Sequence, residues 1–184
     1  MTTQDTALVV IDVQESFRQR DYWSDADAPA FFDRLQALVD GARAQRLPIV
    51  QIFHVEDSGA FSLASGHVKT LAPLSIAADA VFHKHRHSAL VGSGLPVWLT
   101  ERGIRRLIVS GIRTEQCCET TTRHASDEGW QVDFVGEATL TFDMRTPSGE
   151  TLTAAQIRER TETVLVNRFA TLCTVEQALE RARA

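Results

Sequence analysis

The stretch Ala7-Leu-Val-Val-Ile11 is apolar at every position and ends at a carboxylate, Asp12. A strand that is apolar on both faces is typical of a parallel sheet covered by helices on both sides, because a half-solvated strand alternates apolar and polar residues. The stretch therefore predicts a buried strand of such a sheet. Asp12 then lies at the carboxyl edge, where open parallel sheets bind their ligands.

The rest of the chain alternates short strand-like runs with longer amphipathic stretches. Predicted strands cover residues 49–55, 80–84, 105–110, 130–135 and 169–174, and predicted helices cover residues 31–46, 95–102, 117–128 and a last segment ending at 181. Gly129 is expected to follow the third helix as its C′ residue. No repeat or linker interrupts the pattern. It predicts βαβ units and one domain over residues 1–184, with α/β/α layers around a parallel sheet.

The composition is that of a soluble globular protein. Of 184 residues, 43% are hydrophobic and 23% are charged, and a chain of this length can fold without a disulfide or a structural metal. The formal net charge of −5 argues against nucleic acid or an anionic membrane as a partner.

Three cysteines, an odd number without zinc-like spacing, favour a reducing compartment. The apolar run at residues 7–11 is too short for a signal peptide or a membrane span, so we expect a cytoplasmic protein.

Polar groups at the ends of the predicted strands are the candidates for chemistry. Asp12 follows the first strand, Lys84 ends the third, and the segment 111–118 follows the fourth. Asp12 is either a catalytic group or a cap for residues 14–17. Lys84 is either a surface lysine or a buried cation that pairs with Asp12.

Cys117 is a candidate nucleophile. Gly111 allows a sharp turn out of the strand, and Thr114 is a candidate N-cap that places Cys117 in the first helical turn. Free N–H groups there stabilise a thiolate or an oxyanion. The alternative is an inert buried thiol, which is the expectation for Cys118 and Cys173.

Three histidines alternate around Lys84 in an extended arrangement. His83, His85 and His87 would then share one face and could bind a metal. A solvated loop past the strand end is the favoured interpretation.

The chain resembles the isochorismatase-like cysteine hydrolases, a family that includes nicotinamidases and N-carbamoylsarcosine amidohydrolase. Three segments carry the resemblance: Leu8-Val-Val-Ile-Asp12-Val-Gln14-Glu-Ser-Phe17, Lys84-x3-Ser88-Ala89, and Gly111-Ile112-x-Thr114-x-x-Cys117-x-x-Thr120-x3-His124-Ala125-x3-Gly129. It implies a Rossmann-like, six-stranded parallel sheet of order 3-2-1-4-5-6. That order places the first strand beside the fourth, and hence Asp12 next to Cys117.

The resemblance also implies a triad of Cys117, Asp12 and Lys84. Asp12 would take the thiol proton, give it to the leaving amine after Cys117 attacks a carbonyl, and later activate the hydrolytic water. Lys84 would hold Asp12 and stabilise negative charge. The implied oxyanion hole consists of the backbone N–H groups of Arg113 and Cys117, after a cis peptide between Ile112 and Arg113.

The chain departs from the family pattern in two places. Nicotinamidases carry an Asp-x-His-x(n)-His metal set, whereas here His54 and Asp57 lack that spacing, so we expect no catalytic metal and no cofactor. Position 113 is usually small, whereas Arg113 could bind a substrate carboxylate bidentately. The aromatic residues expected to form apolar pocket walls are Phe17, Trp23 and Phe61.

The predicted activity is hydrolysis of a C–N bond in a small amide or carbamoyl compound, by a homo-oligomer that is a dimer or larger. Two alternatives stay open. One is isochorismatase-type vinyl ether hydrolysis, which relatives perform even without the cysteine. The other is a non-catalytic domain that senses redox state through Cys117 and Cys118.

Overall fold

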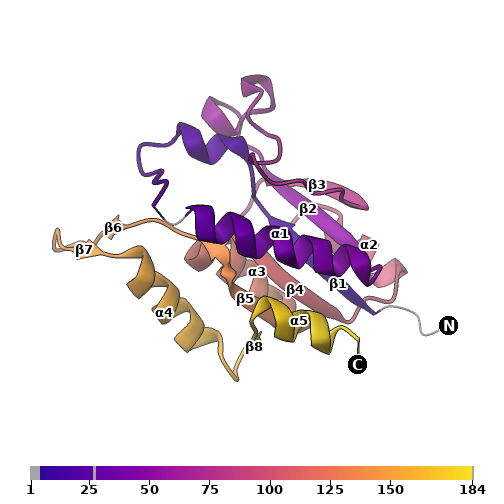
Figure 1. Cartoon of the computed structure of the whole chain (residues 1–184). Coiled ribbons are helices and arrows are strands. Elements are labelled where there is room, and N and C mark those ends of the chain that lie inside the picture. The colour runs from indigo at the N-terminus through magenta and orange to yellow at the C-terminus, as the bar shows by residue number, and fades with distance from the viewer. Residues whose placement is uncertain (1–4, 27, 184) are drawn as a thin grey trace.

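Six parallel strands form the sheet at the centre of the molecule (Figure 1). The structure, a computed structural model, describes residues 5–26 and 28–183, so both ends of the predicted 1–184 domain lie outside the described residues. The spatial order β3-β2-β1-β4-β5-β8 confirms the predicted order of the six sheet strands. These strands are β1 (Thr6–Ile11), β2 (Ile49–His54), β3 (Ala80–Lys84), β4 (Arg106–Ile112), β5 (Gln131–Leu140) and β8 (Thr171–Leu172).

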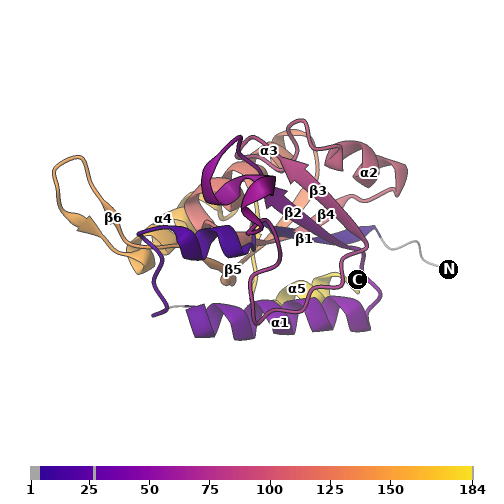
Figure 2. The ribbon, with the colours of Figure 1, turned by 90° about the horizontal axis from the view of Figure 1, so that it is seen from above.

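Helices cover both faces of the sheet, which confirms the predicted three layers. In Figure 2, α1 and α5 lie below the sheet and α2 and α3 lie above it, while α4 contacts α3. The helices are α1 (Ala28–Ala44), α2 (Leu95–Glu101), α3 (Glu119–Asp127), α4 (Ala154–Leu165) and α5 (Val175–Arg181). Shorter helical segments are η1 (Glu15–Gln19), η2 (Gly59–Phe61), η3 (Leu63–Ser65) and the π-helical η4 (Thr114–Cys118). None of the described helices is long and apolar enough to cross a membrane.

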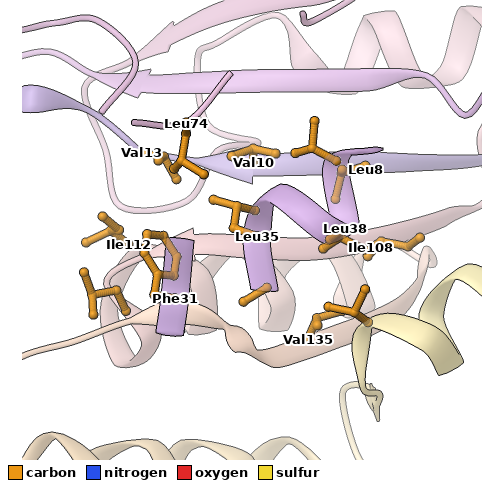
Figure 3. Close-up of a cluster of buried hydrophobic side chains, with 14 of the residues drawn as sticks. Leu8, Val10, Val13, Phe31, Leu35, Leu38, Leu74, Ile108, Ile112 and Val135 are labelled. Atoms are coloured by element: carbon orange, nitrogen blue, oxygen red, sulfur yellow. The ribbon is translucent and has the colours of Figure 1, made fainter. Parts of the chain in front are cut away.

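Strand β1 is buried over its whole length, which explains its uniformly apolar sequence. Leu8 and Val10 pack toward Leu35 and Leu38 of α1 (Figure 3). The residues between and beside them contribute to the buried cluster on the opposite face: Ala7, Val9 and Ile11. Both faces of β1 are therefore closed to solvent, and Asp12 follows directly at its carboxyl end.

The C-terminal third contains elements that the sequence analysis missed. Strand β5 continues to Leu140, five residues beyond its predicted end, and is followed by a hairpin of β6 (Met144–Arg145) and β7 (Thr151–Leu152) that projects from the body (Figure 1). Helix α4 follows. Its signal was present, because Thr153 and Gln156 form a capping box at its start.

Gly111 is required where β1 and β4 approach each other. It has φ +129°, and a Cβ there would lie 2.0 Å from the carbonyl oxygen of Ile11, its partner in the sheet register. We expect Gly111→Ala to lower the free energy of unfolding by about 3 kcal/mol, measured by urea denaturation, because a backbone atom cannot move aside easily. The added methyl group also displaces Ile11, the residue that precedes Asp12.

Gly129→Ala is the matched control. Gly129 has φ +92°, but a Cβ at this position would meet no atom within 4 Å, so only the left-handed backbone disfavours alanine there, by about 1 kcal/mol. Equal losses in the two variants would contradict the steric explanation.

Candidate active site

Asp12, Lys84 and Cys117 meet at the carboxyl edge of the sheet. The ammonium nitrogen Nζ of Lys84 lies 2.8 Å from Oδ2 of Asp12 and 3.3 Å from Sγ of Cys117. Asp12 and Lys84 are 0% exposed and Cys117 is 7% exposed. The sheet order explains why these three side chains lie together. Strands β1 and β4 are neighbours, which places Asp12 near Cys117, and the long side chain of Lys84 reaches from β3 across the end of β2.

Lys84 is a buried cation, not a surface lysine. Besides Asp12 and Cys117, its ammonium group contacts Nδ1 of His54 at 3.1 Å and donates to the carbonyl oxygen of Arg86 at 3.0 Å. Burial lowers the pKa of Lys84, but the charges of Asp12 and Cys117 outweigh burial and leave the pKa raised. Lys84 therefore remains protonated, with four polar neighbours for three N–H groups.

Asp12 does not cap the segment that follows it. Helix η1 has Gln14 at its N-cap and receives no side-chain capping bond. Burial raises the pKa of the Asp12 carboxyl, and Lys84 opposes the rise. Asp12 also has φ +53°, a left-handed conformation that is uncommon outside glycine.

Cys117 is a protonated thiol in the resting site. Burial raises its pKa, the negative charge of Asp12 raises it further, and Lys84 lowers it. The predicted stabilisation of a resting thiolate by the helix start is therefore outweighed.

The chain reaches Cys117 through an unusual turn. The Ile112–Arg113 peptide bond is cis, as the family resemblance implies, and the π-helical η4 then runs into α3. Cys117 lies in the first helical turn, as predicted. The prediction of Thr114 as N-cap is wrong, because Arg113 occupies that position and the Thr114 hydroxyl donates to Thr139 at 2.8 Å.

Gln14 fixes the end of β2 beside Lys84. Its side chain accepts a hydrogen bond from the N–H of His54 at 2.8 Å and donates to the carbonyl oxygen of His54 at 3.1 Å. No role was predicted for Gln14, and His54 was considered only as part of an incomplete metal set. Both residues instead hold the cation of the site in place.

A cavity of about 640 Å³ opens next to these residues. Its walls are mostly polar: His54, Val55, Glu56, Asp57, His85, Arg86 and His87. His54 links the cavity to Lys84, and Nδ1 of His87 lies 3.9 Å from Sγ of Cys117. His87 therefore contacts both the cavity and the sulfur, whereas Cys117 itself does not line the cavity.

The chain matches the sequence model of the isochorismatase domain over residues 6–177. It belongs to the isochorismatase family. The uncharacterized isochorismatase family protein YrdC of Bacillus subtilis is 24% identical over 177 residues, which cover 94% of each chain. Nicotinamidase 3 of Arabidopsis thaliana is 38% identical over 65 residues, 35% of this chain and 33% of that protein.

Solved structures give the same result. The crystal structure of an isochorismatase-type protein from Burkholderia xenovorans superimposes with a TM-score of 0.88 at 28% identity, over 99% of this chain and 89% of that one. The family assignment makes the chain a hydrolase, and the fold is that of the family.

Within the family fold, the three histidines do not act as one set. Strand β3 ends at Lys84, so the alternation stops there; His83 packs against Phe53 with 6.2 Å between ring centroids, whereas His85 and His87 line the cavity. Over residues 5–26 and 28–183, no group of three or more His, Cys, Asp or Glu side chains is arranged to hold a metal ion.

The predicted aromatic wall residues form two separate contacts. The rings of Phe17 and Phe61 pack edge to face with 5.0 Å between centroids, and the centroid of Phe61 lies 5.9 Å from that of His54. This pair therefore packs against the imidazole of His54. Trp23 packs against Phe142 at 5.4 Å. None of the three lines the 640 Å³ cavity, and their contact with substrate stays a prediction.

Arg113 is 7% exposed and lies among aromatic rings. Its guanidinium carbon is 4.9 Å from the ring centroid of Tyr22 and 5.7 Å from that of Phe142, and Nη2 lies 3.1 Å from Oε1 of Glu115. Nε and Nη2 nevertheless have no acceptor in hydrogen-bond geometry among the described residues. The charge of Arg113 is therefore compensated by Glu115, while Nε and Nη2 donate no hydrogen bond among the described residues.

The other cysteines lie in the core, as predicted. Cys118 is fully buried in the cluster on the α2 and α3 face, and Cys173 is buried in the cluster on the α1 face. All three thiols are free.

Because His54 has a lowered pKa, we expect the protein to lose stability at acidic pH. Burial first, and then the positive charge of Lys84, lower the pKa of His54 to about 4. Between that value and about 6.5 the unfolded chain binds more protons at this position than the folded chain does, so stability falls as the pH falls through this range. The loss is up to about 3 kcal/mol.

Urea denaturation between pH 7 and pH 4 measures this dependence. His54→Gln is expected to flatten the curve, whereas His83→Gln, which removes an exposed imidazole, should leave its slope unchanged. An unaltered slope in His54→Gln would show that other groups cause the acid sensitivity.

Proposed function

We propose that this hydrolase cleaves a C–N bond of a small amide or carbamoyl compound through a thioester on Cys117. The supporting observation is the buried cluster in which Lys84 contacts both Asp12 and Cys117 beside a polar cavity. The partial likeness to a nicotinamidase, an enzyme named for an amide substrate, agrees with this class of bond.

The first half of the reaction uses the three side chains in turn. Asp12, whose raised pKa suits a proton acceptor, takes the thiol proton of Cys117 as Sγ bonds to the carbonyl carbon. The C–N bond then breaks, and Asp12 gives the proton to the leaving nitrogen. Lys84 keeps its charge throughout and compensates the negative charge that passes from Asp12 to the substrate.

The oxyanion of the tetrahedral intermediate needs two N–H donors. We assign this role to the backbone N–H groups of Arg113, which belongs to the cis peptide bond, and of Cys117 within η4. Aligned N–H groups at a helix start carry partial positive charge, so they stabilise an anion more strongly than they stabilise a neutral carbonyl.

A screen for ammonia release tests the proposal. Small primary amides, ureas and carbamoyl acids are incubated with the wild-type protein and with Cys117→Ala as the blank. We expect at least one compound of these classes to release ammonia only with the wild-type protein. Hydrolysis of the vinyl ether of isochorismate, detected as release of pyruvate, without any amide hydrolysis would instead support the alternative activity.

Arg113 determines whether the substrate is acidic. Because its guanidinium retains two nitrogens without acceptors, we expect Arg113→Ala to raise KM for carboxylate-bearing amides about 10-fold or more relative to neutral amides. Arg113→Lys, which keeps the charge but loses the bidentate geometry, should recover little. If both substrate classes weaken equally, Arg113 serves only the packing of Tyr22 and Phe142.

A further inference from the structure

The helical run that follows β4 contacts the segment after β3 at three points. Thr121 and His124 of α3 come four and seven residues after Cys117, and residues at these intervals share one face of a helix. Cys117 contacts the ammonium group of Lys84 at the end of β3. Thr121 and His124 contact residues 88 and 89, farther along the same segment.

Two polar contacts attach this segment to α3. The hydroxyl oxygen of Thr121 accepts a hydrogen bond from the backbone N–H of Ala89 at 2.9 Å, and both residues are 0% exposed. The hydroxyl oxygen of Ser88 lies 2.8 Å from Nδ1 of His124. Residues 88–90 are buried, whereas residues 85–87 are exposed and belong to no helix or strand. The exposed turn is therefore held through its buried ends.

This turn carries a partner of the buried cation. The carbonyl oxygen of Arg86 accepts a hydrogen bond from Nζ of Lys84 at 3.0 Å, and Arg86 lies only two residues before Ser88. A shift of the attached residues would therefore move this carbonyl and, with it, the ammonium group beside Cys117. A displacement of about 1 Å at a reacting group can lower a rate on the order of 10²-fold.

We propose that Thr121 and His124 are positioning residues, which set the place of the Lys84 ammonium group beside Cys117 by anchoring residues 88 and 89 on α3. The proposal rests on the function proposed above, in which Lys84 compensates negative charge at the reacting sulfur. Both residues act through Lys84 and take no part in making or breaking bonds.

Thr121→Val and Thr122→Val form a matched pair. Both threonines are 0% exposed in α3, but the hydroxyl of Thr122 has no hydrogen-bond partner among the described residues, and valine has nearly the shape of threonine. We expect Thr121→Val to lower kcat for the amide substrate about 10-fold or more with little change in KM. Thr122→Val should keep the wild-type kcat, and Thr121→Ser, which retains the hydroxyl, should recover most of the loss.

Alkylation of Cys117 by iodoacetamide tests the anchoring without any substrate. Because the charge of Lys84 lowers the pKa of the Cys117 thiol, displacement of the ammonium group should raise this pKa and slow labelling, about 10-fold for each pKa unit. Thr121→Val should show this loss, whereas a core that is merely loosened would expose the thiol and speed labelling. In a Lys84→Met background, Thr121→Val should cause no further slowing, since it acts through Lys84.

His124→Leu tests the second anchor independently, at a side chain that is only partly buried. It should slow turnover and labelling, and His124→Asn, whose amide occupies the place of Nδ1, should recover part of both.

The proposal is overturned by wild-type kcat and labelling in both Thr121→Val and His124→Leu. A loss that Thr122→Val shares, or one that is equally large in the Lys84→Met background, would also overturn it. A failure of the proposed function looks different. In that case no amide is hydrolysed by the wild-type protein, while the labelling rates still decide whether Thr121 and His124 place Lys84.

Discussion

Cys117→Ala is expected to lower kcat/KM for the amide substrate by on the order of 10⁴-fold or more. The substitution removes the atom that forms the covalent intermediate, and the remaining groups act as a unit that has lost its nucleophile. The adjacent thiol cannot replace it, because Cys118 is fully buried in the core cluster on the α2 and α3 face. Ammonia release with the substrate found in the screen measures the loss.

Cys118→Ala is the control, and it should retain the activity while losing some stability. Alkylation by iodoacetamide gives an independent measurement. Because the charge of Lys84 lowers the pKa of the Cys117 thiol, Lys84→Met should slow its labelling. Substantial turnover by Cys117→Ala, together with labelling that ignores Lys84, would favour the packing or redox-sensing interpretation of the cysteine pair.

Lys84→Met is expected to abolish activity and to lower the free energy of unfolding by about 3–5 kcal/mol at pH 7. The substitution leaves Asp12 buried without its cation, and removal of one partner of a buried ion pair is costly because the other charge stays in a low-dielectric interior. Met fills much of the space of the lysine stem, so a cavity contributes little. Urea denaturation at constant protein concentration measures the change.

The double variant Asp12→Asn/Lys84→Met separates charge from packing. With neither charge present, it should be more stable than Lys84→Met alone, which a double-mutant cycle quantifies. The pH dependence has a definite sign. An unpaired buried Asp12 has a pKa above its unfolded value, so the deficit of Lys84→Met should shrink as the pH falls toward about 4. A deficit that does not change with pH would indicate lost packing instead.

The sheet was predictable because its central strands β1, β2 and β4 are buried almost throughout. The run at residues 7–11 and the alternation that follows it suffice for a doubly covered parallel sheet, and the family motifs supplied the strand order. The region after Val135 was not predictable by the same argument. The strand there continues past Gly136, and α4 has a weak apolar stripe, so the capping box at Thr153 was its clearest signal.

The site was predictable only in part. Asp12 and Cys117 follow neighbouring strands, so their proximity follows from the sheet order. The role of Lys84 remained open because its strand is not adjacent to β1, and only the length of the side chain across β2 brings its charge to Asp12. The contacts of Gln14 and His87 join segments far apart in sequence, and no local pattern encodes them.

The ammonium group of Lys84 has four polar neighbours for three protons, and the sulfur is the weakest acceptor among them, because the thiol of Cys117 is protonated at rest. The three stronger acceptors, on Asp12, His54 and Arg86, match the three N–H groups in number. The positive charge is therefore anchored by oxygen and nitrogen atoms, and its position does not depend on what the sulfur carries.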